Sequence, residues 1–171
     1  LEQFLGKKVV LAFFPAAFSG VCTAELCAIS EDYNRFTSAD SVVLPISVDW
    51  VPALKAFKAH EQMTVDLLSD SKREVVRAYG VYLDAAFVSK RAYMLIDKAG
   101  IVRWVHVESE LGHSRPNGEL LEQLAARPER PGGGRTEHIV AGEDDEIGAP
   151  RLHVDVAVGD GLRRIHQDQR A

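Results

Sequence analysis

The sequence has few cysteines, no long hydrophobic run and no block of basic residues, and each absence excludes a class of protein. Only two of the 171 residues are cysteine, whereas small secreted proteins built on disulfides use more cysteines and close longer loops. No apolar run approaches the roughly 18–20 residues that a membrane span needs. The formal net charge is −5, without a basic stripe, which argues against a nucleic-acid partner.

These absences predict a protein that binds neither membrane nor nucleic acid. The apolar run at residues 9–14 is short and aromatic-rich, as in a buried strand, and does not resemble the apolar part of a signal peptide. Nothing in the sequence marks the chain for export, so we expect a cytoplasmic location. Hydrophobic residues make up 46% and charged residues 26% of the chain, which is typical of globular proteins, and 171 residues suffice for one domain.

The two cysteines, Cys22 and Cys27, lie five positions apart. So close a pair, in a chain without export signals, indicates either redox or metal chemistry. A zinc site needs about four ligands, and neither a Cys-x-x-Cys motif nor a clustered histidine pair supplies the others. We therefore expect redox chemistry, with no bound metal and no cofactor.

Hydrophobic periodicity predicts an alternation of strands and helices. The order β-α-β-α-β-α-β-β-α indicates an α/β fold of the thioredoxin-like type, with a mixed central β-sheet and helices on both faces. The predicted strands are residues 7–14, 41–48, 65–68, 91–96 and 101–107, and the predicted helices are residues 21–36, 52–60, about 71–79 and 117–126.

The composition changes after residue 127. No aromatic residue follows Trp104 and no lysine follows Lys98, and residues 127–135 are rich in proline and glycine. Residues 153–158 alternate like a strand, but one that stands alone. We predict a domain at residues 1–127, followed at 128–171 by a linker and a C-terminal tail of low order. A non-native continuation of the chain is the alternative for this tail.

Several features around Cys22 favour a reactive thiolate. A thiol attacks a peroxide only as thiolate, and an ordinary cysteine is mostly protonated at neutral pH. Cys22 lies in the opening turn of a predicted helix, where free N–H groups favour an anion. Ser19 stands three residues earlier and can donate a hydrogen bond, while Arg91 at the start of a later strand is the candidate cation. Pro15 ends the first strand and turns the loop over the thiol.

These residues carry a resemblance to a known family. Residues 14–26 (FPAAFSGVCTAEL) resemble the peroxiredoxin active-site motif Pro-x-x-x-Thr/Ser-x-x-Cys, and residues 91–100 (RAYMLIDKAG) are similar to the strand that begins with the family's active-site arginine. The resemblance implies that Cys22 is the peroxidatic cysteine, that Ser19 positions the substrate and that Pro15 shields the thiol.

The resemblance covers roughly residues 1–126. Glu25 stands where the family often carries an acidic residue, and Cys27 is similar to the resolving cysteine of the bacterioferritin-comigratory or Q-type subgroup. The residues around Cys22 also resemble the one-cysteine E-type subgroup, so the subgroup stays open. Serine replaces the commoner threonine at Ser19, and we expect the family's N-terminal hairpin to be missing from this sequence.

The predicted function is a thiol-dependent peroxidase that reduces hydrogen peroxide or organic hydroperoxides in cell redox homeostasis. The predicted reductant is thioredoxin or a similar dithiol, and the predicted state is a monomer or a homodimer. A thioredoxin-like disulfide reductase or a redox-dependent holdase is the alternative, although such proteins normally carry Cys-x-x-Cys. A non-catalytic interaction domain is a third hypothesis.

Overall fold

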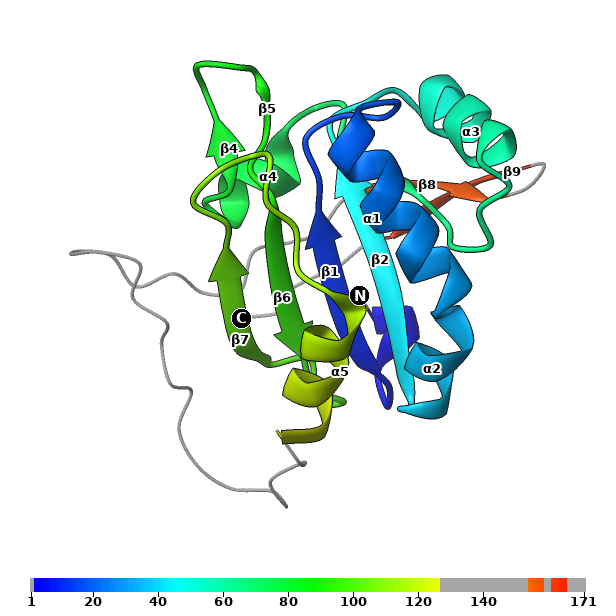
Figure 1. Cartoon of the computed structure of the whole chain (residues 1–171), viewed down its shortest axis with the longest axis vertical. Coiled ribbons are helices and arrows are strands. Elements are labelled where there is room, and N and C mark those ends of the chain that lie inside the picture. Colours follow the sequence, from blue (N-terminus) through cyan, green and yellow to red (C-terminus); the bar gives the residue numbers. More distant parts are fainter. Residues whose placement is uncertain (1, 127–153, 159–160, 166–171) are drawn as a thin grey trace.

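The computed structural model describes residues 2–126, 154–158 and 161–165 (Figure 1). None of the helices in this part of the chain is both long and apolar enough to span a membrane. The strands are β1 Lys8–Phe13, β2 Ser41–Ser47, β3 Leu68–Ser69, β4 Tyr82–Leu83, β5 Val88–Ser89, β6 Ala92–Ile96, β7 Val102–Val107, β8 Val154–Val158 and β9 Gly161–Ile165. The helices are the 3-10 helix η1 Glu2–Phe4 and the α-helices α1 Gly20–Glu31, α2 Tyr33–Ser38, α3 Val51–His60, α4 Glu74–Ala78 and α5 Asn117–Ala126.

The main sheet is mixed, with the strand order β7-β6-β1-β2-β3-β8-β9. β1, β2 and β3 run parallel to one another, whereas β6 runs antiparallel to β1. In this register Ala92 lies opposite Phe13. The residue before β6 therefore lies beside the loop that leaves the end of β1.

The central strands are buried on both faces, and alternate residues face different halves of the core. On one face Val10, Ala12 and Phe14 pack with residues of α1, α2, α3 and α5. On the other face Val9, Leu11 and Phe13 pack with residues of α4 and with the partly buried side chains of the β4–β5 hairpin. The predicted α/β fold with helices on both faces of a mixed sheet is confirmed, with most of the helices on one face.

The long helix predicted at residues 21–36 is divided at Asp32 into α1 and α2 (Figure 1). The Asp32 carbonyl accepts a hydrogen bond from the Arg35 N–H at 2.8 Å, a tighter turn than an α-helix makes. The Asp32 carboxylate accepts hydrogen bonds from the side chains of Arg35 and Asn117 at 3.1 and 3.0 Å. An apolar stripe nevertheless runs along both helices, because Cys22 at its start and Phe36 at its end are both buried in the same part of the core.

The strand predicted at residues 153–158 is present as β8, but it does not stand alone. It pairs antiparallel with β3 on one side and with β9 on the other. The prediction of an isolated strand was wrong because β3 offers an open sheet edge, which alternation within one segment cannot show. The other residues of the predicted linker and tail, 127–153, 159–160 and 166–171, lie outside the described residues, so the division of the chain at 127 stays a prediction.

Candidate active site

Cys22 is the third residue of α1, and its side chain is 1% exposed. It belongs to the apolar core on the α1 face of the sheet, together with Leu26, Ile29 and Tyr93. Ser19 precedes the helix in an extended conformation, and its carbonyl accepts the first helical hydrogen bond from Thr23 N at 2.8 Å. Cys22 therefore lies in the first turn of the helix, as the sequence predicted.

The loop between β1 and α1 is tied to the end of β2. The carboxylate of Asp49, two residues after the end of β2, accepts hydrogen bonds from the Ala17 N–H and the Ser47 hydroxyl, both at 2.8 Å. At the entry to the loop the Phe14 N–H donates to the Ile46 carbonyl at 2.9 Å. Fixing both the strand end and the middle of the loop fixes the start of α1, and with it the position of Cys22.

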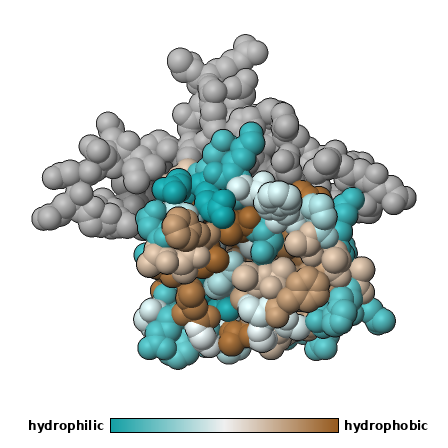
Figure 2. All heavy atoms as spheres, turned by 90° about the horizontal axis from the view of Figure 1, so that it is seen from above, coloured by the Kyte–Doolittle hydropathy of each residue, from teal (hydrophilic) through white to brown (hydrophobic). Residues whose placement is uncertain are grey.

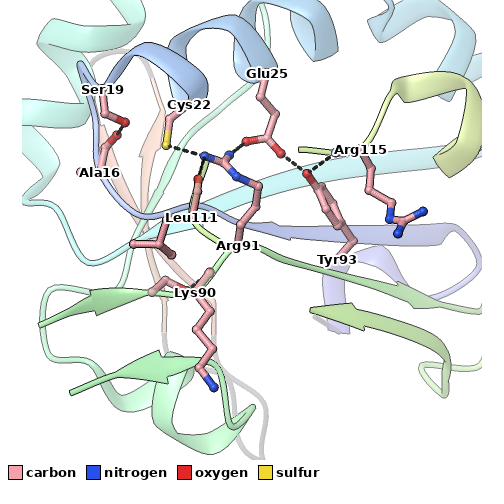
Figure 3. A network of polar contacts seen from close by, with 10 residues as sticks. Ala16, Ser19, Cys22, Glu25, Lys90, Arg91, Tyr93, Leu111 and Arg115 are labelled. Atoms are coloured by element: carbon pink, nitrogen blue, oxygen red, sulfur yellow. Dashed lines mark hydrogen bonds and ion pairs between the residues drawn. The ribbon is translucent and has the colours of Figure 1, made fainter. Parts of the chain in front are cut away.

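Arg91 reaches Cys22 from the position directly before β6, the strand that pairs with β1. Side chains two positions apart on a strand share a face, so Arg91 and Tyr93 both point to the α1 side of the sheet (Figure 3). The Arg91 guanidinium is buried, and its Nη2 donates to Cys22 Sγ at 3.2 Å and to the Leu111 carbonyl at 3.1 Å. A buried cation thus contacts the sulfur directly and donates a hydrogen bond to it.

Glu25 completes the charge balance, one helical turn after Cys22. Its side chain is 3% exposed, and the carboxylate forms an ion pair with Arg91 Nη1. The other carboxylate oxygen accepts a hydrogen bond from the Tyr93 hydroxyl at 2.5 Å, and that hydroxyl accepts one from Arg115 N at 3.0 Å. The pair is buried, and burying a charge is tolerated only where a counter-charge and hydrogen bonds compensate it.

The sequence also predicted Ser19 and Pro15 for the site. The Ser19 hydroxyl donates to the Ala16 carbonyl at 2.9 Å, not to the thiol (Figure 3). Pro15 is buried directly after Phe14. The catalytic roles assigned to Ser19 and Pro15 stay predictions.

Cys27 lies on the same unbroken helix as Cys22, and both cysteines are free thiols. Its side chain is partly buried, and Sγ lies 3.9 Å from Glu61 Oε2 in a weak hydrogen bond. Partial burial first, and then the negative charges of Glu61 and Glu31, raise the pKa of the Cys27 thiol. The two thiols therefore have different surroundings, because Cys22 faces a cation and Cys27 faces carboxylates.

Sequence reasoning missed three components of the site. Glu25 was noted only as an acidic position, although its spacing of three from Cys22 places both on one helix face. Tyr93 could have been found from its spacing of two from Arg91 on one strand. The Leu111 carbonyl is a backbone group, so no residue type could have indicated it.

Apolar side chains surround the end of the molecule at which α1 begins. Figure 2, a view from above, shows hydrophobic atoms grouped between polar ones on this face. The large hydrophobic residues exposed in the segments that leave this end of the sheet include Phe18, Trp50, Phe87 and Leu111. Among the described residues, no cluster of histidine, cysteine and carboxylate side chains could hold a metal ion.

Residues 1–105, more than half of the chain, match the AhpC/TSA family. The chain belongs to the AhpC/TSA family. This membership confirms the resemblance to peroxiredoxins that residues 14–26 and 91–100 indicated.

Two relatives of this AhpC/TSA protein differ in the share of their own length that this chain covers. The chain is 36% identical over 122 residues to alkyl hydroperoxide reductase E of Mycobacterium tuberculosis, covering 70% of this chain and 79% of the relative. It is 33% identical over 133 residues to the mitochondrial thioredoxin-dependent peroxide reductase of Mus musculus, covering 74% of this chain and 51% of the relative. The chain thus spans about half the length of the mouse protein.

Solved structures of the AhpC/TSA family share this fold. The crystal structure of Enterococcus faecalis AhpC superposes with a TM-score of 0.70 at 27% identity, covering 73% of this chain and 77% of the other. The fold is therefore thioredoxin-like, as the order of predicted elements indicated.

Proposed function

We propose that the chain is a thiol peroxidase in which Cys22 reduces hydrogen peroxide or an organic hydroperoxide. The observation that carries the proposal is the 3.2 Å contact between Arg91 Nη2 and Cys22 Sγ, in the first turn of α1. A buried cation beside a buried sulfur serves no packing purpose that an apolar pair would not serve as well. It does stabilise a thiolate, which is the form of cysteine that reacts.

In the proposed reaction the Cys22 thiolate attacks one oxygen of the peroxide. A sulfur–oxygen bond forms and the oxygen–oxygen bond breaks, so the sulfur is oxidised to a sulfenic acid while the peroxide is reduced. The leaving oxygen takes a proton and departs as water or alcohol. Arg91 lowers the barrier because its charge remains beside the negative charge as that charge moves from sulfur to the leaving oxygen.

The guanidinium keeps one donor for the substrate. Arg91 Nε is buried and has no hydrogen-bond partner among the described residues. An unsatisfied buried donor costs free energy unless a ligand uses it. We assign it to a peroxide oxygen, with the Ser19 hydroxyl as a second donor once it leaves the Ala16 carbonyl. Because Cys22 is 1% exposed, the segments around it must move slightly to admit the peroxide.

Cys27 is proposed to attack the sulfenic acid, releasing water and forming a disulfide, which thioredoxin or a similar dithiol then reduces. The relative from Mus musculus is itself named a thioredoxin-dependent peroxide reductase, which supports this choice of reductant. A cytoplasmic location and a monomeric or homodimeric state belong to the same proposal. A one-cysteine cycle would instead leave Cys22 as sulfenic acid until the external thiol arrives.

Consumption of hydrogen peroxide by the full chain, with thioredoxin and its reductase, tests the proposal. We expect Cys22→Ser to abolish turnover and Cys27→Ser to keep one rapid turnover for each protein molecule. Full turnover by Cys22→Ser would contradict the assignment. Insulin reduction without peroxide consumption by the unchanged chain would instead favour the disulfide reductase.

The carboxylates around Cys27 predict how the disulfide-forming step depends on pH. The raised pKa of Cys27 keeps it protonated at neutral pH, so disulfide formation should accelerate as the pH rises toward that pKa. Glu61→Gln removes one of the negative charges, lowers the pKa of Cys27 and should speed the step at pH 7 by about twofold to fivefold. Rapid quench with mass spectrometry measures the disulfide. Glu122→Gln, an exposed change on α5, is the control, and equal rates in the two variants would refute the prediction.

A further inference from the structure

Tyr93 connects the carboxylate of Glu25 with the backbone of Arg115. The side chain is fully buried, its hydroxyl donates to Glu25 Oε1 at 2.5 Å, and the same hydroxyl accepts from Arg115 N at 3.0 Å. Burial raises the pKa of Tyr93 to about 12. The hydroxyl therefore keeps its proton throughout the neutral range and remains a donor to the Glu25 carboxylate.

The hydroxyl of Tyr93 fixes the carboxylate that holds the guanidinium. One oxygen of Glu25 accepts from Tyr93 and the other accepts from Arg91, so the carboxylate cannot rotate without breaking a buried hydrogen bond. The guanidinium is planar and its N–H groups keep fixed relative directions. Holding one of its nitrogens at Glu25 therefore directs the other at Cys22.

Tyr93 also holds the segment that covers the site. Three hydrogen bonds attach the segment after β7 to Arg91 and Tyr93: Glu108 N donates to the Arg91 carbonyl at 2.9 Å, the Leu111 carbonyl accepts from the Arg91 guanidinium, and Arg115 N donates to the Tyr93 hydroxyl. Two of these contacts depend on the side chains of Arg91 and Tyr93 (Figure 3). The same two residues thus set both the position of the cation and the position of its backbone acceptor.

We propose that Tyr93 is a positioning residue of this peroxidase, which acts through Glu25 to hold the Arg91 guanidinium against Cys22. The proposal rests on the proposed function for its meaning in catalysis. Glu25 competes with Cys22 for the charge of Arg91. The hydrogen bond from the Tyr93 hydroxyl stabilises part of the negative charge on Glu25. Glu25 then attracts the guanidinium less strongly, and the guanidinium interacts more strongly with the sulfur of Cys22.

The test is Tyr93→Phe, which removes only the hydroxyl oxygen. We expect the reaction of Cys22 with hydrogen peroxide at pH 7 to slow by about tenfold, the effect of losing one buried hydrogen bond to a charged group. Tyr79→Phe is the matched control, because Tyr79 packs on Phe13 on the opposite side of the sheet. Stopped-flow measurement of both variants, together with their melting temperatures, gives the comparison.

A double-mutant cycle separates positioning from packing. If Tyr93 acts through Glu25, then Tyr93→Phe made in Glu25→Gln protein should slow the reaction by less than about twofold. An equal tenfold loss in both backgrounds would overturn the proposal, as would equal slowing by Tyr93→Phe and Tyr79→Phe. An unchanged rate in Tyr93→Phe would also overturn it.

A measurement without peroxide keeps this proposal separate from the proposed function. Alkylation of Cys22 by iodoacetamide in Cys27→Ser protein reports the thiolate alone, and we expect Tyr93→Phe to slow it as well. If the unchanged chain consumes no peroxide, the proposed function fails, but slower alkylation would still support the role of Tyr93. If the chain consumes peroxide and alkylation is unaffected, the role of Tyr93 fails while the function stands.

Discussion

Replacing Arg91 by methionine is expected to slow the reaction of Cys22 with hydrogen peroxide by about 10²–10³-fold, the range seen when one donor to a developing charge is removed. Methionine keeps a long side chain in the buried space but carries no charge and no donor. The Arg91 Nη2 contact with Cys22 Sγ is lost, so both the thiolate and the leaving oxygen lose their cation. Stopped-flow kinetics under pseudo-first-order conditions measure the change.

The same substitution leaves Glu25 buried without its counter-charge. Breaking a buried ion pair from one side costs about 3–5 kcal/mol in stability, and the side chains of Arg91 and Glu25 are 1% and 3% exposed. The double variant Arg91→Met/Glu25→Gln removes both charges and should recover most of the free energy of unfolding without recovering the rate. Urea unfolding beside the kinetic assay tests this separation. A double variant as fast as the unchanged chain would show that Arg91 acts only on stability.

Oxidation of the full chain by one equivalent of hydrogen peroxide should unwind the start of α1. Residues five apart on a helix are separated by about 7.5 Å of rise alone, whereas the Cα atoms of a disulfide lie within about 7 Å. Cys22 and Cys27 share one continuous helix of 12 residues. A disulfide between them therefore removes about two turns of helix, which far-UV circular dichroism detects.

The change should depend on both cysteines. Cys27→Ser, treated in the same way, should form the sulfenic acid at Cys22 and keep its helical signal. Mass spectrometry of the same samples establishes which product is present. An intramolecular disulfide accompanied by an unchanged dichroism spectrum would contradict the unwinding. A sulfenic acid with no disulfide would indicate the one-cysteine cycle.

The parts of the fold that sequence could predict are those with strong local signals. The strand predicted at residues 7–14, with its apolar run at 9–14, is the interior strand β1. The amphipathic helix predicted at 117–126 has the bounds of α5. The β4–β5 hairpin was missed because its strands are two residues long, which is too short to show a period. The break at Asp32 was missed because the apolar stripe continues across it.

The sequence predicted Cys22 and Arg91 as site residues, but it predicted neither Tyr93 nor the geometry of the site. The spacing of Ser19 and Cys22 and the arginine at the head of a later strand could be read directly. That β6 lies beside β1, and so brings Arg91 to the sulfur, depends on strand order, which no local pattern encodes. The hydrogen bond from Ser19 to the Ala16 carbonyl depends on how the loop closes, and the contact with Leu111 involves only its backbone.

Because Cys22 is buried in the apolar core, we expect oxidation of its sulfur beyond the sulfenic acid to lower the stability of the fold. A sulfenic acid is neutral, but further oxidation gives a sulfinate, which carries a permanent negative charge and two oxygens. That anion would share a single guanidinium with Glu25, among the side chains of Leu26 and Ile29. We therefore expect a molecule oxidised in this way to lose packing around Cys22 as well as the reactive thiol.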